Sequence, residues 1–571
     1  MNQRIQLASI DDQRNAAARE AVRRRISWPV NLTPANVTYH SRGHVVLIGA
    51  VQPVIAAARA LQHQGLASLT LLTLNDAAEL PAGSEPVIEQ PLSAEQLAQL
   101  TITGHLGAFH LQVPFSQGET LDLAQVLVER DAFDVVLDLT APGMLPAMPW
   151  ELPPPGYLRL APEAADEQRQ QVLESAVELV GEFDKPRYFQ VNTDLCAHSA
   201  SGNVGCTRCL DVCPADAITS IKGRIESRIE IDPFLCQGVG SCTSACPTGA
   251  IEFRLPETRR QQDTLAAWLE AYREAGGEVP VLRFVTHDTL EQERQAGVVT
   301  PGHLIDVPLE ELGAAGHDQW LTALASGASE VRIQLHEGMP PRLSTFLNHQ
   351  VALAHGLLAA LGHAVERIQL VAANATDARD ALPSLLPLSD TAVSFREPNK
   401  RTRLNQVLAR LAALGTPSGE RQALPEGAAY GGIDVDSSAC TLCYACVSNC
   451  PTPALQAGGD TPVLSFLEAD CVQCGLCEQA CPENAITLVP GFLAAPARET
   501  RHVCHEEPAF ECIGCGKPFA TVSTVAAMKT KLANHPYFAG EALARLEMCE
   551  DCRVKDVWKT MMRDPDAQLK V

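Results

Sequence analysis

The first third of the chain alternates short apolar runs with stretches of helical periodicity. The apolar runs begin at Val45 (VVLIGA), Ser68 (SLTLLTL) and Phe133 (FDVVLDLT), and each predicts a buried strand. The segment PVIAAARALQHQG, which follows the first run, repeats apolar residues at helical spacing. Strands and helices in alternation are typical of a parallel α/β sheet, so we expect an N-terminal α/β domain over residues 1–185.

The turn after VVLIGA is where such a domain would bind a nucleotide. A dinucleotide-binding turn has the pattern G-x-G-x-x-G, because glycines let the backbone approach the phosphates. Here the turn reads Gly49, Ala50, Val51, Gln52 and Pro53. Two of the three glycines are missing, so the sequence favours a degenerate Rossmann-like domain over a working nucleotide site.

A second α/β pattern follows later in the chain. VLRFVTH, from Val281, and VERIQLV predict strands on either side of QWLTALASGASEVRIQL and of the long helical stretch FLNHQVALAHGLLAALGH. We predict an α/β domain over residues 256–395 and a helical linker over residues 396–428. His349 and His355 lie six positions apart on the long helix, which is not ligand spacing, so we expect surface or hydrogen-bonded histidines.

Charge narrows the classes of partner. The chain has 68 acidic and 44 basic residues among 571, and its net charge of −24 repels phosphate backbones and anionic lipid headgroups. Nucleic acid is therefore not an expected partner. No apolar run approaches the roughly 18 residues of a membrane span, and the charged start MNQRIQLASIDDQRNAAAREAVRRRISW lacks a secretory signal pattern. We expect a cytoplasmic protein without a membrane span.

Twenty cysteines, none before Cys196, are the main chemical signal. In a reducing compartment such clusters of cysteine indicate metal ligands rather than disulfides. Two runs near the carboxyl end both have the spacing C-x2-C-x2-C-x3-C-P, which is that of bacterial iron-sulfur proteins. They consist of Cys440, Cys443, Cys446 and Cys450, and of Cys471, Cys474, Cys477 and Cys481.

This spacing predicts two 4Fe-4S clusters with exchanged ligands. The short x2 loops wrap one cluster, whereas the cysteine before proline points away and ligates the other cluster. The predicted ligand sets are Cys440, Cys443, Cys446 and Cys481 for one cluster, and Cys471, Cys474, Cys477 and Cys450 for the other. Zinc also uses C-x2-C pairs, but runs this dense with a trailing proline fit cubane clusters better.

An earlier block of cysteines has the same pattern with one gap. Its runs are Cys196, Cys206, Cys209 and Cys213, followed by Cys236, Cys242 and Cys246. The same exchange assigns one 4Fe-4S cluster to Cys196, Cys206, Cys209 and Cys246, and leaves three ligands, Cys213, Cys236 and Cys242, for the other. Val239 stands where a fourth cysteine belongs. Because valine offers no lone pair, we expect a 3Fe-4S or a labile 4Fe-4S cluster there, with an empty site as the alternative.

The two blocks resemble bacterial two-cluster ferredoxins over about 60 residues each. PADAITS and PENAITL begin at the prolines that follow Cys213 and Cys481. The resemblance implies two β-α-β-β-α-β modules, over residues 186–255 and 429–492, that transfer electrons. The stretch GEFDKPRYFQVNTDLCAHSASGNVGCTRCLDVCP further resembles polyferredoxin-like proteins associated with bacterial formate dehydrogenases. ALASGASEVRIQL and its following helix resemble the small iron-sulfur subunit linked to hydrogenases and heterodisulfide reductases, without its cysteines, which implies a domain retained for its shape.

The remaining cysteines lie in the last segment, residues 493–571. Two C-x2-C pairs lack the trailing proline and predict a closed four-cysteine zinc site that stabilises a small domain. The pairs are Cys512 with Cys515 and Cys549 with Cys552. Cys504 is left over, and we expect it to be a buried thiol rather than an additional ligand.

These features together favour a multidomain α/β plus α+β protein that carries electrons. We expect three 4Fe-4S clusters, one 3Fe-4S or labile cluster and one zinc, and redox proteins as partners, with a formate dehydrogenase as a candidate. No phosphate cradle or nucleophile motif accompanies them, so catalysis is not required. Two alternatives remain: an oxidoreductase subunit with flavin or nicotinamide in an α/β domain, and a maturation scaffold for a formate dehydrogenase.

Overall fold

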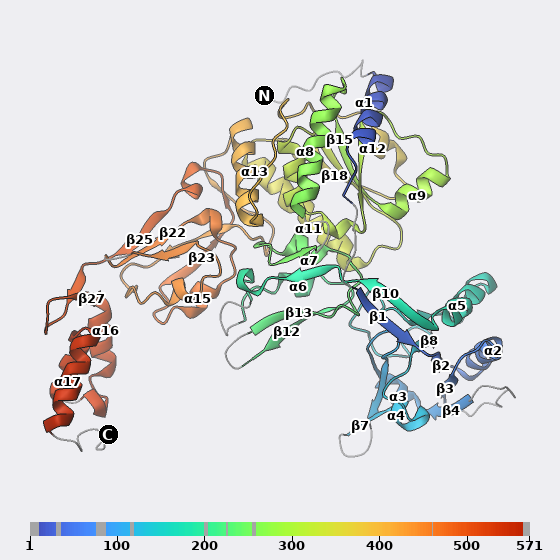
Figure 1. The fold of residues 1–571 in the computed structure, drawn as a ribbon, viewed down its shortest axis with the longest axis horizontal. Coiled ribbons are helices and arrows are strands. Elements are labelled where there is room, and N and C mark those ends of the chain that lie inside the picture. Colours follow the sequence, from blue (N-terminus) through green and yellow to red (C-terminus); the bar gives the residue numbers. More distant parts are fainter. Residues whose placement is uncertain are drawn as a thin grey trace.

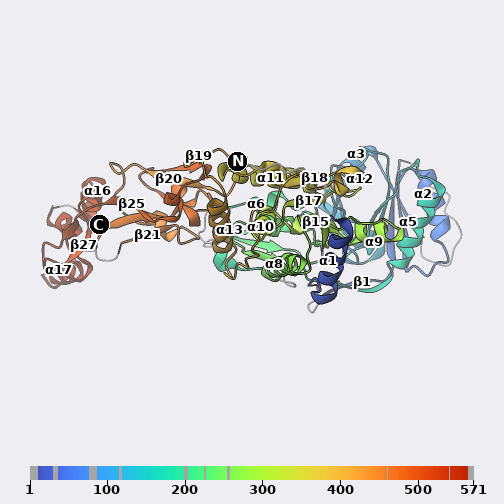
Figure 2. The same cartoon turned by 90° about the horizontal axis from the view of Figure 1, so that it is seen from above.

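The computed structural model describes residues 11–29, 36–75, 87–114, 119–198, 204–223, 227–253, 258–458, 461–538 and 540–563. The described parts form an elongated molecule, with the N-terminal sheet and the C-terminal segment at opposite ends (Figures 1 and 2). Among the helices in these ranges, none combines the length and the apolar character of a membrane span.

The N-terminal domain is built on a five-stranded parallel sheet of order β4-β3-β2-β8-β9. Its strands are β2 (His44–Gly49), β3 (Ser68–Leu74), β4 (Val87–Leu92), β8 (Val135–Leu139) and β9 (Tyr157–Arg159). Helices α2 (Val51–Leu61) and α5 (Asp166–Glu178) pack together on one face of the sheet, over Val45, Leu47 and Leu69. The apolar runs form the central strands of the sheet, since a strand that is buried on both faces consists almost entirely of apolar residues.

Smaller elements complete this domain. A three-stranded sheet consists of β5 (Thr101–Thr103), β6 (His110–Pro114) and β7 (Thr120–Asp122), next to α3 (Ala94–Ala98) and α4 (Leu123–Val128). β1 (Asn36–Ser41) pairs with β10 (Gly181–Pro186), whose end leads directly into the first cysteine block.

The central domain contains a four-stranded parallel sheet of order β16-β15-β17-β18. Its strands are β15 (Val281–Thr286), β16 (Leu304–Leu309), β17 (Glu330–Gln334) and β18 (Ile368–Val371), and its helices are α8 (Thr258–Glu274), α9 (His287–Gln295), α10 (His317–Ala325), α11 (Pro341–Ala360) and α12 (Thr376–Asp380). Trp320, Leu324 and Leu357 are fully buried in its core.

Two helices depart from the predicted boundaries. α1 (Asp12–Arg25) was expected within the N-terminal domain, but Ala18 and Val22 pack in the central core, and Arg19 donates hydrogen bonds to the carbonyls of Thr300, Pro301 and Leu304. The expectation that residues 1–185 form one unit is therefore wrong for this helix. Its attachment depends on polar contacts with distant carbonyls, which hydrophobic periodicity does not reveal.

The predicted linker over residues 396–428 is also wrong in part. α13 (Lys400–Leu414) places Leu404, Val407 and Leu411 in the core of the central domain. A helix that buries this apolar face is an integral part of the domain, because its removal would expose the face to water.

Each ferredoxin-like module has the element order β-α-β-β-α-β. Module 1 consists of β11 (Phe189–Val191), α6 (Arg208–Asp211), β12 (Ile218–Lys222), β13 (Ser227–Ile231), α7 (Ser241–Ala245) and β14 (Ile251–Phe253). Module 2 consists of β20 (Gly431–Val435), α14 (Ala445–Ser448), β21 (Leu455–Ala457), β22 (Val463–Phe466), α15 (Leu476–Ala480) and β23 (Ile486–Pro490). In both modules the outer strands pair with each other and the inner strands pair with each other, all antiparallel.

The C-terminal segment contacts module 2. β25 (His502–Glu506) extends the inner sheet of module 2 by pairing with β22, and β19 (Arg421–Gln422) pairs with β24 (Phe492–Leu493). Beyond them lie β26 (Ala509–Glu511), β27 (Pro518–Thr521), α16 (Val522–Leu532) and α17 (Glu550–Arg563). The hydroxyls of Thr521 and Thr524 donate to the carbonyl of Thr441, so the tail contacts the first cysteine run of module 2.

Candidate metal centres

Two small cavities in module 2 are each lined by four cysteines. Cys440, Cys443, Cys446 and Cys481 line one of them, and Cys450, Cys471, Cys474 and Cys477 line the other. In each set, three cysteines come from one run and the cysteine before proline comes from the other run. The structure thus brings together the same two sets of four cysteines that the predicted exchange of ligands assigns to the two clusters.

The backbone of the cysteine loops explains how the thiols converge. The residue just before the short helix is left-handed in three of the runs, at Gly240, Tyr444 and Gly475. Such a residue reverses the chain tightly, so that the x2 loop wraps around a central point. Tyr444 adopts this left-handed conformation, at a φ of 60°, although it has a side chain and glycine does not.

The donor set fits a cationic cluster. Burial raises the pKa of Cys446 to about 12 and that of Cys474 to about 11. Buried thiols of this kind remain protonated in an apolar pocket unless a positive charge stabilises the thiolate. Iron would supply that charge, and a cluster of iron and sulfide bound by these cysteines would accept and release single electrons.

Module 1 brings its cysteines together in two groups. Cys209 has Cys246, Cys206 and Cys196 as its electrostatic neighbours, and burial is the main reason that its pKa is raised. Cys242, whose pKa burial also raises, interacts most strongly with Cys236 and Cys213 and less with Cys209 and Cys246. These are the group of four and the group of three that the spacing predicts.

Val239 lies at the boundary between module 1 and the central domain. Its side chain is half-buried and packs against the core of that domain. The next residue, Gly240, approaches Ala314 so closely that a Cβ built on the glycine would lie 2.6 Å from the Ala314 Cα. The open corner of the three-cysteine group therefore faces the central domain.

Two cations near the three-cysteine group were not anticipated from the sequence. Lys185 donates hydrogen bonds to the carbonyls of Phe234 (2.8 Å) and Cys236 (2.9 Å), and Arg342 donates to the carbonyl of Cys213 (2.8 Å). They come from the end of β10 and from α11, far from the cysteine runs. A short-range motif contains no signal for them.

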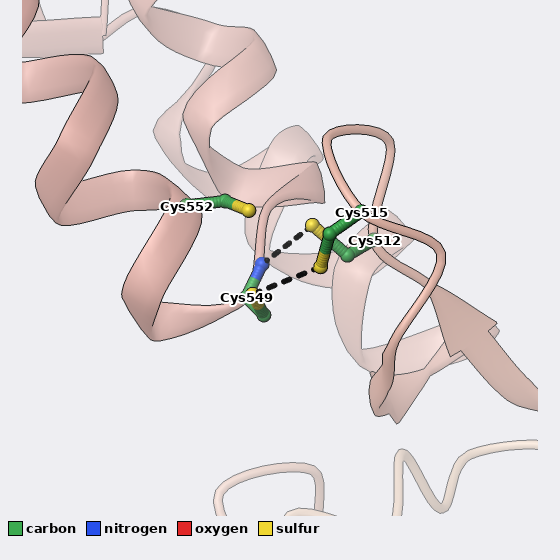
Figure 3. A group of neighbouring side chains, drawn as sticks. All are labelled: Cys512, Cys515, Cys549 and Cys552. Carbon is green, nitrogen blue, oxygen red and sulfur yellow. Dashed lines mark hydrogen bonds between the residues drawn. The ribbon is translucent and has the colours of Figure 1, made fainter.

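The tail cysteines form the most compact group. Cys512, Cys515, Cys549 and Cys552 place their sulfur atoms within 4.8 Å of one another, from a turn after β26 and from the start of α17 (Figure 3). The Cys515 and Cys549 sulfurs are 3.7 Å apart, which matches the edge of about 3.8 Å of a tetrahedral site with metal–sulfur bonds of about 2.3 Å. Although burial opposes it, hydrogen bonds from the N–H groups of Cys549 and Gly514 lower the pKa of Cys512 to about 6.

The other residues considered in the sequence have ordinary partners. His349 and His355 each pair with a backbone carbonyl, of Glu426 and Ile368. Cys504 lies on β25 near Cys440, outside the four-cysteine group, and burial raises its pKa to about 11.

Comparisons with known proteins agree with the module assignment. Residues 204–250 and residues 439–486 each match a 4Fe-4S dicluster domain family. The chain is also similar to an uncharacterized ferredoxin of Methanocaldococcus jannaschii, with 37% identity over 60 residues, which is 95% of that protein and 10% of this chain. On these matches, the chain belongs to the ferredoxins, as a large member with two dicluster domains.

Proposed function

We propose that this protein passes single electrons between redox partners, as an accessory or electron-transfer subunit of a larger oxidoreductase. The observation that carries the proposal is the exposure of Cys443. Among the cysteines of the two modules it is the one classed as exposed, whereas the others are half-buried or buried. An exposed ligand corner is a surface at which a partner can exchange electrons without entering the fold.

The proposal assigns a ligand set to each centre. Three 4Fe-4S clusters are assigned to the three groups of four cysteines, a 3Fe-4S or labile 4Fe-4S cluster to Cys213, Cys236 and Cys242, and one zinc to the tail cysteines. The loaded protein would then contain about 15 irons and about one zinc per chain.

A formate dehydrogenase is the partner that we propose, on the resemblance carried by the first cysteine block. The test is anaerobic purification from the native cell under gentle conditions, with identification of co-purifying proteins and metal analysis of the complex. A formate dehydrogenase in the complex would support the partner, and its absence from every preparation would contradict it.

The ligand sets are tested by paired substitutions in module 2. Cys443→Ser is expected to weaken or remove one cluster and to leave the cluster of Cys450, Cys471, Cys474 and Cys477 assembled, because that set does not include Cys443. Cys474→Ser should produce the converse loss. Iron analysis and the electron paramagnetic resonance (EPR) spectrum of the reduced protein measure both, and an unchanged iron content in either variant would contradict the assignment.

A cavity favours a second candidate function. A space of about 440 Å³ lies between α11, α13 and module 1, and Cys246, Phe346 and Leu404 contribute to its lining. An apolar cavity that borders a cluster ligand is suited to a planar organic redox group such as flavin. The absorption spectrum of the supernatant after acid denaturation tests this candidate: a released flavin supports it, and a colourless supernatant from fully loaded protein contradicts it.

A further inference from the structure

The two dicluster modules contact each other through one cysteine ligand of each module. Cys206 of module 1 is an electrostatic neighbour of Cys474 of module 2, although 267 intervening residues separate them. Gly205, next to Cys206, lies against Leu476, since a Cβ built on the glycine would be 3.2 Å from the Leu476 Cδ1. Leu476 in turn lies between Cys474 and Cys477 in the sequence.

Arg208 links the two corners directly. Its guanidinium donates to the Cys206 sulfur (3.4 Å), to the carbonyl of Gln473 (3.3 Å) and to the carbonyl of Gly427 (2.9 Å). Gln473 immediately precedes Cys474. One side chain therefore binds a cluster ligand of module 1 and the cysteine loop of module 2.

The start of α13 links the modules a second time. Lys400 donates to the carbonyls of Thr243 (2.8 Å) and Ser244 (3.4 Å) in module 1, and Arg401 donates to those of Ala469 (2.8 Å) and Cys471 (2.7 Å) in module 2. Both side chains are buried, and two cations at a helix N-terminus oppose the helix dipole. Their bonds to both modules, together with the Asp318 carboxylate 3.6 Å from the Lys400 Nζ, offset this unfavourable placement.

The two cysteines at the junction occupy the same position in their cysteine runs. Cys206 is the second cysteine of the first run in module 1, and Cys474 is the second cysteine of the second run in module 2. The remaining second positions are Cys443, which is exposed, and Val239, which faces the central domain. Second positions thus point outward from a module, and two of them meet at the junction.

We propose that the junction of Cys206 with Cys474, fixed by Arg208, Lys400 and Arg401, joins the two modules into one series of four centres. This inference rests on the proposed function. An electron lost by one module is gained by the other, and no bond forms or breaks. Arg208 is a positioning residue, and its charge beside Cys206 is expected to raise the reduction potential of module 1.

The junction is tested by the magnetic relaxation of module 1 in the reduced full-length protein. The EPR signal that disappears in Cys209→Ser identifies the group of Cys196, Cys206, Cys209 and Cys246. In Cys474→Ser this signal should saturate at several-fold lower microwave power, because a fast-relaxing neighbour is lost or altered. Cys443→Ser is the matched control, since it changes the corner that faces away, and it should leave the signal unchanged.

The outcomes separate this inference from the proposed function. The first outcome is that iron analysis shows loaded modules, that dithionite reduces them, and that the module 1 signal saturates alike in the unaltered protein, Cys474→Ser and Cys443→Ser. This outcome overturns the junction, while the electron-transfer function stands. If neither module can be reduced, the proposed function fails as well.

Arg208 is tested separately. Arg208→Met should lower the potential of the module 1 signal and ease its saturation, and Arg208→Lys should restore part of the potential. The control is Arg501→Met, because the bonds of Arg501 go to two carbonyls of module 2, those of Pro453 and Ala454, and not to a cluster ligand of module 1. If Arg208→Met and Arg501→Met behave alike at equal iron content, Arg208 does not position the junction.

Discussion

At the residue scale, the second position of each cysteine run determines what that run contacts outside its own module. Three of these positions hold cysteine, and their surroundings differ: Cys443 is exposed, whereas Cys206 and Cys474 lie together. The fourth, Val239, packs against the central core. The same place in a repeated motif therefore serves as an outer contact, as a junction, or as an open corner.

The open corner leads to a prediction about iron content. Val239→Cys should add about one iron per chain and convert a 3Fe-4S signal into that of a stable 4Fe-4S cluster, because a thiolate then completes the ligand set. EPR of the oxidised protein and iron analysis measure the change. Val212→Cys is the control, since Val212 is also half-buried against the central core but occupies no ligand position. An unchanged iron content and spectrum in Val239→Cys would contradict the proposed wrapping of this group.

Much of the candidate site could be predicted at this scale, because a ligand set depends on short spacings. All 19 cysteines assigned to centres are named by their spacing alone. The spacing could not reveal Lys185, Arg342 or Arg401. Each reaches a cysteine carbonyl from a separate element, and such contacts depend on the three-dimensional arrangement of the whole chain.

At the element scale, a buried histidine joins three segments around the start of module 2. His317 on α10 pairs with the Gln350 Oε1 on α11 at 2.6 Å and with the Tyr430 hydroxyl, just before β20, at 2.9 Å. Burial lowers the pKa of His317 to about 4. The folded protein therefore holds this ring neutral over a range in which the unfolded chain would protonate it.

The sign of the resulting pH dependence follows from the lowered pKa. The stability that the neutral ring contributes is complete above about pH 6.5 and is lost as the pH falls toward about 4, by up to about 3 kcal/mol. His317→Gln should therefore flatten the fall in thermal unfolding temperature between pH 7.5 and pH 5, even if it is less stable at neutral pH. A profile that falls as steeply as that of the unaltered protein would contradict this assignment.

His336 provides a control of opposite sign. Its hydrogen bond to the Glu311 carboxylate is the main reason that its pKa is raised. The stability from this pair is present below about pH 6.5 and is lost as the pH rises through the folded pKa. His336→Gln should thus reduce stability at pH 5 more than at pH 7.5, as measured by the same unfolding temperatures.

The repeated module order could be predicted at the element scale, whereas the places of α1 and α13 could not. Paired strands and short helices follow from local apolar patterns and turns. A helical pattern predicts a helix but does not name the sheet that it covers. α13 packs on the central domain through Val407 and Leu411, and nothing in its own sequence distinguishes this from a linker helix.

At the scale of the whole molecule, the chain ends in a helix that packs loosely on the rest of the tail. α17 contains no buried residue, and Trp558 is 63% exposed. Helices that bury so little apolar surface are marginally stable in water. The four-cysteine group at the start of α17 is therefore expected to hold the tail together.

Removal of the tail metal should unfold the tail alone. Anaerobic protein is expected to contain about one zinc per chain, and chelation should abolish amide-exchange protection in α16 and α17 while the iron content stays constant. Cys549→Ser should have the same effect, and Cys504→Ser, a change outside the group, should not. Iron in place of zinc, identified by anomalous scattering, would contradict the metal assignment and indicate a fifth iron centre.

The exposure of Cys443 also determines which cluster ligand is oxidised first in air. Oxidants reach exposed sulfur ligands before buried ones, and Cys242 at the other end of the series is only 5% exposed. Oxidation of the sulfur ligands should therefore begin at Cys443 and reach Cys242 last. A briefly aerated sample would keep most of its iron and yet have lost the end at which electrons enter or leave, so that metal content alone overstates the working fraction of a preparation.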